Sequence, residues 1–262
     1  MTWEDKRVLI VVRTYPVPAR KGIEVSCTAG VTDSGQWVRL FPVPYRFLDT
    51  DKRFRKYQWI DVSVLKAAND PRPESYKLNA DSIRVGESVS SENQWRARRK
   101  LLRPLVRHSL CEIQRTRSQN GFPTLGLFKP AQIKRLVIEP AKQPDWTLEQ
   151  ADLLRQTLLF SNNPDQPLEK VPLDFRYEFT CQDPQCTGHR MICTDWEMGQ
   201  SYRVWTKKYG ADWEAAFRHR YEKEMIEKFD THFYVGTLHQ YPDVWIIVGL
   251  FYPPPITAPD LF

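Results

Sequence analysis

Residues 6–13 read KRVLIVVR, and this apolar run between charged residues predicts a buried β-strand. Three further segments predict strands close by: residues 24–30 (EVSCTAG), 36–41 (QWVRLF) and 57–65 (YQWIDVSVL). Short strands that follow one another closely are typical of small β-barrels. We therefore predict a small, partly closed β-barrel in the N-terminal part of the chain.

A helical segment follows the predicted barrel. Ser91, with Gln94 three residues later, forms a capping-box pattern and predicts a helix to about residue 102. Pro104 interrupts this helix, and a second is predicted over 105–117. Beyond it, strands are predicted at 125–128, 132–139, 175–180, 232–237 and 244–252, and helices at 147–160, 202–209 and from 212 onward. The expected fold is α+β in two parts, residues 1–144 and 145–262, the first carrying a helical arm at about 91–120.

The composition excludes several classes of protein. Of 262 residues, 41% are hydrophobic and 27% charged, as in ordinary globular domains. The longest apolar run, residues 244–252, is less than half a membrane span, and the N-terminus lacks the apolar stretch of a secretory signal. The five cysteines are odd in number and clustered, which argues against a disulfide scaffold. We expect a cytoplasmic protein.

Charge is distributed unevenly along the chain. The net charge is +6, yet residues 145–262 contain 18 acidic and only 11 basic residues. The excess of positive charge comes largely from residues 95–117, which hold eight arginines and lysines and one glutamate. This separation predicts a basic part that binds an anionic partner and an acidic part suited to a cation or to acid–base chemistry.

The basic helices are the candidate nucleic-acid-binding element. Much of their charge recurs at three- and four-residue spacing, on one helix face, and such a face can neutralise phosphates. The candidate residues are Arg96, Arg98, Arg99, Lys100, Arg103 and Arg107. A second cluster lies beside Tyr57 and Trp59, aromatics suited to base stacking, and consists of Lys52, Arg53, Arg55 and Lys56. The alternative is a solvated face, or one paired with the acidic part. The partner is predicted to be DNA or RNA.

Three of the five cysteines and one histidine lie within thirteen residues. Cys181, Cys186, His189 and Cys193 are thiolate and imidazole ligands of the kind that zinc prefers, and four can close a tetrahedron. Their spacing is near the common zinc patterns without matching them, so Asp195 or a water remains open as the fourth ligand in place of Cys193. The alternative is a turn with ordinary buried thiols. We predict zinc, in a structural role.

Asp195 and Glu197 follow this block and are the candidate catalytic residues. With the Cys/His site they could assist a zinc-activated water, as in nucleobase deaminases, or they could bind a divalent cation for phosphodiester cleavage. The deaminase motifs and the restriction-type Glu-x-Lys pattern are both absent. The alternative is that the two carboxylates cap the helix that follows them, where anionic groups are favoured.

Two resemblances extend these predictions. The N-terminal third, with VLIVV at 8–12, RKG at 20–22 and WVRL at 37–40, resembles PUA-like and ASCH-type barrels, which implies binding of RNA or modified bases. Residues 177–197, with FYVGT at 233–237 and GLFYPP at 249–254, are similar to a family of uncharacterised bacterial proteins. That similarity implies no activity.

Three functions therefore stand open. The first is a nucleic-acid-binding protein with a structural zinc, for which a role in prokaryotic DNA modification or phage defence is a hypothesis. The second is a metal-dependent enzyme that modifies nucleic acid, for example at 7-deazaguanine bases, through the Cys/His site with Asp195 or Glu197. The third is a protein-interaction module whose basic arm docks an acidic partner.

Overall fold

The structure is a computed structural model that describes residues 2–19, 24–160 and 167–256. The RKG segment at 20–22 lies outside these residues. The chain divides into two compact units, each built from three separate segments. The first unit comprises Met1–Ser88, Ile138–Asp174 and Thr194–Gln200, and the second comprises Val89–Val137, Phe175–Cys193 and Ser201–Phe262. The predicted boundary near residue 145 lies inside a segment of the first unit, and the basic arm belongs to the second.

The first unit contains a closed five-stranded barrel, which confirms the predicted α+β class. Its strands are β1 (Glu4–Arg13), β3 (Glu24–Thr32), β4 (Trp37–Val43), β5 (Gln58–Lys66) and β6 (Ser75–Leu78). They pair in the order β1-β3-β4-β6-β5, and β5 pairs with β1 to close the ring. Closure removes the sheet edges that an open sheet would expose. The short strands β2 (Val17–Pro18) and β7 (Arg84–Ser88) add to this sheet, through β3 and β5 respectively.

The alternation of the strands fills the barrel. Val8 and Ile10 of β1, Leu40 of β4 and Ile60 of β5 are at most 1% exposed and belong to one core cluster. Inward-facing residues recur at every second position, as the pleat requires. Strand β6, with the sequence SYKL, has only two apolar residues, Tyr76 and Leu78, and these four residues are too short a stretch to predict a strand by themselves.

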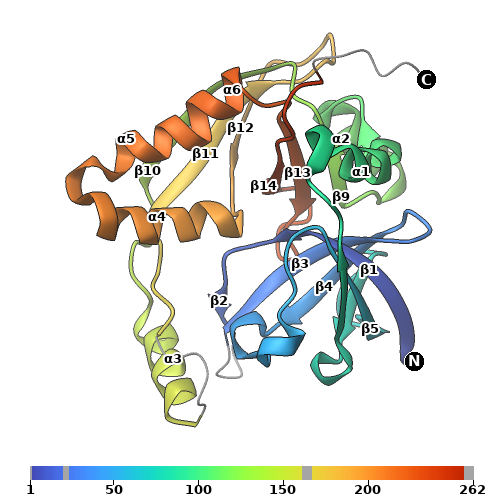
Figure 1. The fold of residues 1–262 in the computed structure, drawn as a ribbon, viewed down its shortest axis with the longest axis vertical. Coiled ribbons are helices and arrows are strands. Elements are labelled where there is room, and N and C mark those ends of the chain that lie inside the picture. Colours follow the sequence, from blue (N-terminus) through green and yellow to red (C-terminus); the bar gives the residue numbers. More distant parts are fainter. Residues whose placement is uncertain (1, 20–23, 161–166, 257–262) are drawn as a thin grey trace. The chain divides into compact units, whose positions relative to one another are not determined.

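The second unit contains two sheets. One has the order β14-β13-β9-β8, and the other has the order β10-β11-β12, with β10 and β11 beginning or ending in the first unit (Figure 1). The strands are β8 (Val106–Arg107), β9 (Leu125–Phe128), β10 (Gln132–Pro140), β11 (Leu173–Thr180), β12 (His189–Ile192), β13 (His232–Thr237) and β14 (Trp245–Phe251). Phe233 of β13 packs against Tyr177 and Phe179 of β11, with ring centroids 5.1 Å apart in each case, and so joins the two sheets.

Helices complete both units. The second unit carries α1 (Glu92–Leu102), α2 (Leu110–Asn120), α5 (Trp213–Arg218), α6 (Glu224–Glu227) and most of α4 (Trp196–Tyr209), and the first carries α3 (Leu148–Phe160). Helix α5 lies along the sheet of β10 and β11 (Figure 1), where Phe217 stacks on Phe175 at 4.5 Å. No helix in the described part of the chain is long and apolar enough to cross a membrane.

The start of α1 differs from its prediction. Ser91 makes no side-chain cap, and Asn93, Gln94 and Trp95 have positive φ angles of 48°, 54° and 63°. The capping-box interpretation of Ser91 and Gln94 was therefore wrong. The physical reason is tertiary: the Trp95 ring packs 5.7 Å from that of Phe251.

The second predicted helix begins later than expected. Helix α2 starts at Leu110, where the Ser109 hydroxyl accepts a hydrogen bond from the Glu112 N–H at 3.0 Å. A short 3-10 turn ends at Leu105, and β8 follows at Val106–Arg107, so the α-helix does not begin at residue 105 as predicted. Ser109 and Glu112 have the same Ser-x-x-Glu spacing as a capping box, and this pattern marks the true start.

Candidate metal centre and basic face

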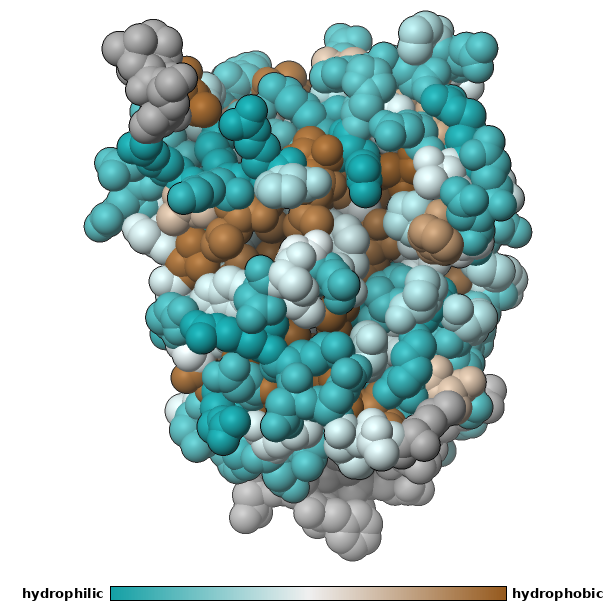
Figure 2. Space-filling view, turned by 90° about the vertical axis from the view of Figure 1, so that its right-hand side faces the viewer, coloured by the Kyte–Doolittle hydropathy of each residue, from teal (hydrophilic) through white to brown (hydrophobic). Residues whose placement is uncertain are grey.

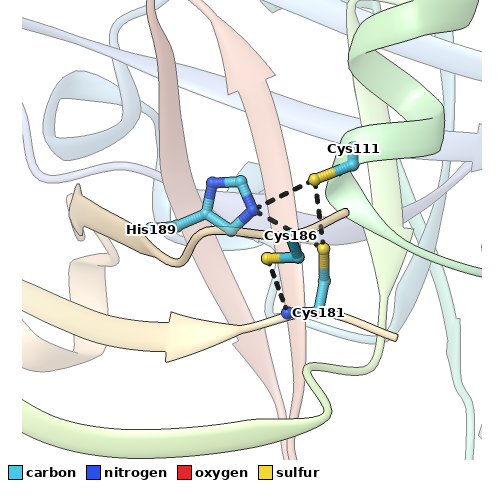
Figure 3. Close-up of side chains that lie close together, drawn as sticks. All are labelled: Cys111, Cys181, Cys186 and His189. Atoms are coloured by element: carbon cyan, nitrogen blue, oxygen red, sulfur yellow. Dashed lines mark hydrogen bonds between the residues drawn. The ribbon is translucent and has the colours of Figure 1, made fainter. Parts of the chain in front are cut away.

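Four side chains of the second unit converge on one point. The ligand atoms of Cys111, Cys181, Cys186 and His189 all lie within 4.8 Å of one another (Figure 3). The Cys111 Sγ is 3.4 Å from both the Cys181 Sγ and the His189 Nε2, and the Cys181 Sγ is 3.5 Å from the same nitrogen. The cluster is partly shielded, because Cys181 is buried and the other three are half-buried.

Three segments of the chain deliver these ligands. Cys111 lies in the first turn of α2, Cys181 directly follows β11, and His189 opens β12. Because β11 and β12 pair in antiparallel register with Phe179 opposite His189, the connecting loop returns the histidine to the end of β11. The Phe179 ring stacks on the imidazole at 5.1 Å and fixes its plane.

The loop between Cys181 and His189 is tied to helix α2 a second time. The Asp183 carboxylate accepts a hydrogen bond from Arg115 of α2 at 2.5 Å and another from the Gln185 N–H at 3.0 Å. The Asp183 carbonyl accepts from the Cys186 N–H at 3.0 Å, which forms the turn that presents this thiol. The hydrogen bond from Arg115 lowers the pKa of Asp183. Such supporting contacts orient the ligands of metal sites.

Burial and mutual contacts shift the pKa values of three of the four side chains. Burial raises the pKa of Cys111 to about 12, with a further contribution from the neighbouring Cys181. Burial also raises the pKa of Cys181, but hydrogen bonds from backbone and thiol groups outweigh it and the net pKa is lowered. Burial lowers the pKa of His189, so its imidazole is neutral at neutral pH, as a ligand must be.

The ligand atoms of this group indicate which metals it could bind. Three thiolates and one imidazole are typical of zinc, and four protein ligands complete its tetrahedron. Catalytic zinc sites retain an open position for water, whereas a Cys₃His set fills all four. The group could therefore bind a metal such as zinc.

The metal-binding group differs from the predicted set at one position. Cys193 is not part of it, and Cys111 stands in its place. Cys193 is 4% exposed; its N–H donates to the Phe175 carbonyl at 2.7 Å, and its backbone bridges to Ile247. It is thus a core residue beside two strands. The Ser109-x-x-Glu112 pattern predicts that Cys111 lies in the first turn of a helix, but no pattern in the sequence links it to the Cys/His block.

Asp195 and Glu197 belong to the barrel unit, whereas the Cys/His cluster belongs to the other. The Asp195 carboxylate accepts a hydrogen bond from the Glu197 N–H at 2.7 Å, at the start of α4. Lys56 lies 3.6 Å from Asp195 and 3.7 Å from Glu197. The cavity beside these residues has a volume of about 30 Å³, comparable with a single water molecule. Asp195 therefore lies as expected if it caps the helix that follows it, the alternative to a catalytic role.

Next to this pair, an arginine is enclosed by aromatic rings. The guanidinium of Arg13 lies 3.7 Å from the centre of the Tyr45 ring and 4.1 Å from that of Trp196. Burial lowers the pKa of Arg13, and the charges of Tyr45, Asp195 and Glu197 oppose that effect. Cation–π contacts of this kind stabilise a partly desolvated arginine, so the arrangement helps to hold Trp196, within the barrel unit, beside Tyr45.

The second predicted basic cluster is largely engaged within the barrel unit. Lys52 lies 3.1 Å from Asp49 and 3.6 Å from Asp81, and Arg53 donates to the carbonyls of residues 46 and 48. Lys56 faces the two carboxylates of the α4 start. Arg55 lines the small cavity beside them. Because three of the four cations have partners in their own unit, the cluster does not form a uniform cationic face.

The basic residues of α1 are arranged differently. They line a hollow of about 730 Å³ within the second unit. Its lining consists of Asn93, Gln94, Arg96, Arg99, Lys100, Arg103, Pro104, Val106, His232, Phe251 and Ile256. Of the predicted residues, Arg98 does not line the hollow: it donates to the Val89 carbonyl, before α1, and lies 4.6 Å from the Trp95 ring centre. Arg107 is in β8 and is not among the lining residues.

One carboxylate anchors this helix. Arg99 donates to Asp230 at 2.7 Å and to the Pro254 carbonyl at 2.6 Å, and Lys129 lies 2.6 Å from the same carboxylate. Burial raises the pKa of Asp230, but the hydrogen bonds from Lys129 and Arg99 outweigh it, so the net pKa is lowered. Asp230 thus compensates part of the charge of Arg99 and fixes α1 beside β13 and β14.

Comparison with known proteins gives two family matches. Residues 106–262, more than half of the chain, match a family described as "Domain of unknown function (DUF8757)". Residues 4–104 match a second family, described as "Domain of unknown function (DUF8758)". The metal-binding group lies entirely within the first match and the barrel strands within the second. No curated protein matches the chain.

Proposed function

The chain belongs to the DUF8757 family, whose function is unknown, and we propose that this member is a nucleic-acid-binding protein with a structural zinc. Strands of DNA or RNA bind through the cationic wall of helix α1. The zinc, held by Cys111, Cys181, Cys186 and His189, joins α2 to the β11–β12 hairpin and stabilises the unit that contains α1.

The observation that carries this proposal is the arginine-lined hollow. Arg96, Arg99, Lys100 and Arg103 come from one helix face, and no acidic residue is among the described residues that line the hollow. Asp230 offsets Arg99, so most of the remaining positive charge comes from the other three. At about 1.5 Å of rise per residue, Arg96 and Arg103 are separated by roughly 10 Å along the helix. That length suits contact with more than one phosphate of a strand.

Two features favour nucleic acid over an acidic protein. The site is concave, whereas protein interfaces of standard size are extended surfaces. It also combines cations with apolar walls from Pro104, Val106 and Phe251. In the upper half of Figure 2, which faces the side where α1 and α2 are drawn, hydrophobic surface lies exposed between hydrophilic side chains. Bases and phosphates together require both kinds of surface.

The zinc-centred enzyme remains the second candidate, and two observations weigh against it. The Cys₃His set fills the tetrahedron with protein ligands. Asp195, its proposed acid–base partner, caps α4 and faces Lys56 in the other unit. We therefore favour binding over catalysis.

The test is binding of fluorescent single-stranded DNA, single-stranded RNA and duplex DNA, measured by anisotropy over a range of salt concentrations. We expect binding that weakens steeply with salt, by about 0.9 log units per log unit of salt for each phosphate contact on duplex and 0.7 on single strands. The double variant R96A/R103A should bind at least about tenfold more weakly and with a smaller salt slope, as expected for two lost phosphate contacts.

The matched control is K207A/K208A, which removes two positive charges from the last turn of α4. Its affinity should stay within about twofold of the wild type, since these lysines do not line the hollow. Circular dichroism and zinc content verify that each variant is folded. Absence of binding, binding insensitive to salt, or equal losses in both variants would overturn the proposal.

A further inference from the structure

The lining of the hollow beside α1 combines two chemically different kinds of residue. Arginines and a lysine supply positive charge, while Pro104, Val106, Phe251 and Ile256 supply apolar surface. Two amide side chains, those of Asn93 and Gln94, complete the lining together with His232. A volume of about 730 Å³ lies within the 300–1,000 Å³ typical of pockets for small organic ligands.

The two amides are carried by a left-handed turn. Asn93, Gln94 and Trp95 all have φ between 48° and 63°, and none of them is glycine. For residues other than glycine this conformation costs about 1–2 kcal/mol each, so it persists only where the surroundings enforce it. Strain of this kind is concentrated at binding and catalytic sites more than elsewhere.

Contacts within the second unit hold the left-handed turn in place. The Trp95 ring lies 5.7 Å from that of Phe251 and 5.4 Å from that of Tyr252, and Arg98 covers its other side at 4.6 Å. The Gln94 carbonyl accepts a hydrogen bond from the Arg99 side chain at 3.0 Å. The ring contacts of the half-buried tryptophan therefore fix the backbone, and this backbone sets the two amides in the wall of the hollow.

His232 adds one more hydrogen-bonding group. Its Nδ1 lies 2.9 Å from the Asp230 carbonyl, a distance at which the ring donates the Nδ1 proton to that oxygen. Burial lowers the pKa of His232, which favours the neutral ring. A neutral ring that carries its proton on Nδ1 has Nε2 as an acceptor.

These groups together match one ligand class. Asn and Gln amides each offer a donor and an acceptor, the pattern found on the edges of nucleobases. Apolar walls suit the faces of a base, and arginines suit phosphate oxygens. A fatty acyl anion would make no use of the hydrogen-bonding groups of the amides and the imidazole, and inorganic phosphate would use only the cations.

We infer that the hollow receives a single nucleotide of the bound strand, its base against Asn93, Gln94 and Phe251 and its phosphate against Arg96, Lys100 and Arg103. This inference rests on the proposed function, since the strand itself binds along α1. It adds that the protein takes one base out of the stack and discriminates among bases by hydrogen bonds to the two amides.

The test compares homo-oligonucleotides of the four bases with an abasic sugar–phosphate oligomer of the same length. The variant N93G/Q94G removes both amides, and glycine adopts positive φ without cost, so the turn and the fold are retained. We expect the wild type to prefer one base and to bind the abasic oligomer roughly tenfold more weakly, in line with one good base contact. In N93G/Q94G the preference among bases should disappear, while the salt slope is unchanged.

The matched control is Q119G/N120G, which removes an exposed amide pair at the end of α2, outside the hollow. It should keep the base preference of the wild type. Equal affinity for the four homo-oligonucleotides and the abasic oligomer would overturn the inference while leaving strand binding intact. Absence of binding to every oligomer would instead overturn the proposed function, so the two failures are distinguishable.

Discussion

At the scale of single residues, the five cysteines have different roles. Cys111 lies within 3.4 Å of two other ligand atoms of the metal-binding group, whereas Cys193 is a buried core residue with a backbone bridge to Ile247. We predict that C111S loses the bound zinc and several kcal/mol of stability, because structural zinc contributes its binding free energy to folding. C193S should keep the zinc and lose only about 1–3 kcal/mol, the cost of a buried unpaired hydroxyl.

Zinc per chain, measured by elemental analysis, and thermal unfolding check this prediction. C27S serves as a control, since Cys27 lies in the barrel strand β3. The assignment of ligands would be contradicted if C193S lost the metal while C111S retained it.

Cys111 could not be found from the spacing of the Cys/His block. It lies 70 residues before Cys181, and no local pattern encodes contact over that separation. Cys181, Cys186 and His189 were predictable, because turns inside one loop bring them together. The fourth position required the packing of α2 against β11, which depends on the tertiary fold.

A second prediction at this scale concerns His232. Burial lowers its pKa below 6.5; Asp230 opposes this effect, and Lys129 and Arg99 add to it. The unfolded chain therefore binds a proton more readily than the folded one, and stability decreases as the pH falls below about 6.5. Denaturant unfolding at a series of pH values should show this loss, and H232Q should lose less stability over the same interval. An identical pH dependence in the variant would exclude His232 as its source.

At the scale of elements, two similar capping patterns have opposite outcomes. Thr147 and Gln150 form a reciprocal box, with each side chain bonded to the other's N–H at 3.1 Å. Ser91 makes no such bond, because residues 93–95 are left-handed. We predict that T147A lowers the free energy of unfolding by about 1 kcal/mol, whereas S91A changes it by less than about 0.5 kcal/mol.

Chemical denaturation of the two variants provides the comparison, and each serves as the control for the other. A loss in S91A as large as that in T147A would mean that Ser91 caps α1 in solution. Which of the two variants loses more free energy of unfolding is therefore informative even if both losses are small.

These helix ends show what the sequence reveals about elements. Strands with strong apolar runs, such as KRVLIVVR in β1, and the helix at Thr147 were predictable because their signals are local. The start of α1 was not, since the contact of Trp95 with Phe251 joins residues far apart in sequence and overrides the capping pattern. The unpredicted β6 is only four residues long, and its two apolar residues give too weak a local signal.

At the scale of the whole molecule, the chain passes between its two units several times. Thr194–Gln200 returns to the barrel unit, where Tyr15 N–H donates to the Thr194 carbonyl at 2.9 Å. Gly199 lies so close to Tyr15 that an added Cβ would be 2.3 Å from the ring. The two family matches meet between residues 104 and 106, whereas the first segment of the barrel unit ends at Ser88. A single cut point in the sequence therefore cannot separate the two units.

Removal of the metal tests whether the two units also differ in their local stability. The ligands tie α2 to the ends of β11 and β12, all in the second unit. We predict that chelation increases hydrogen exchange in β11, β12 and the first turn of α2, while the barrel strands β1, β3 and β5 keep their protection, because local stability follows local contacts. Mass spectrometry of peptides before and after chelation measures this, and added zinc should restore the original exchange. A uniform increase across both units would instead mean that the metal controls one global unfolding transition, and unchanged exchange would mean that it contributes no folding stability.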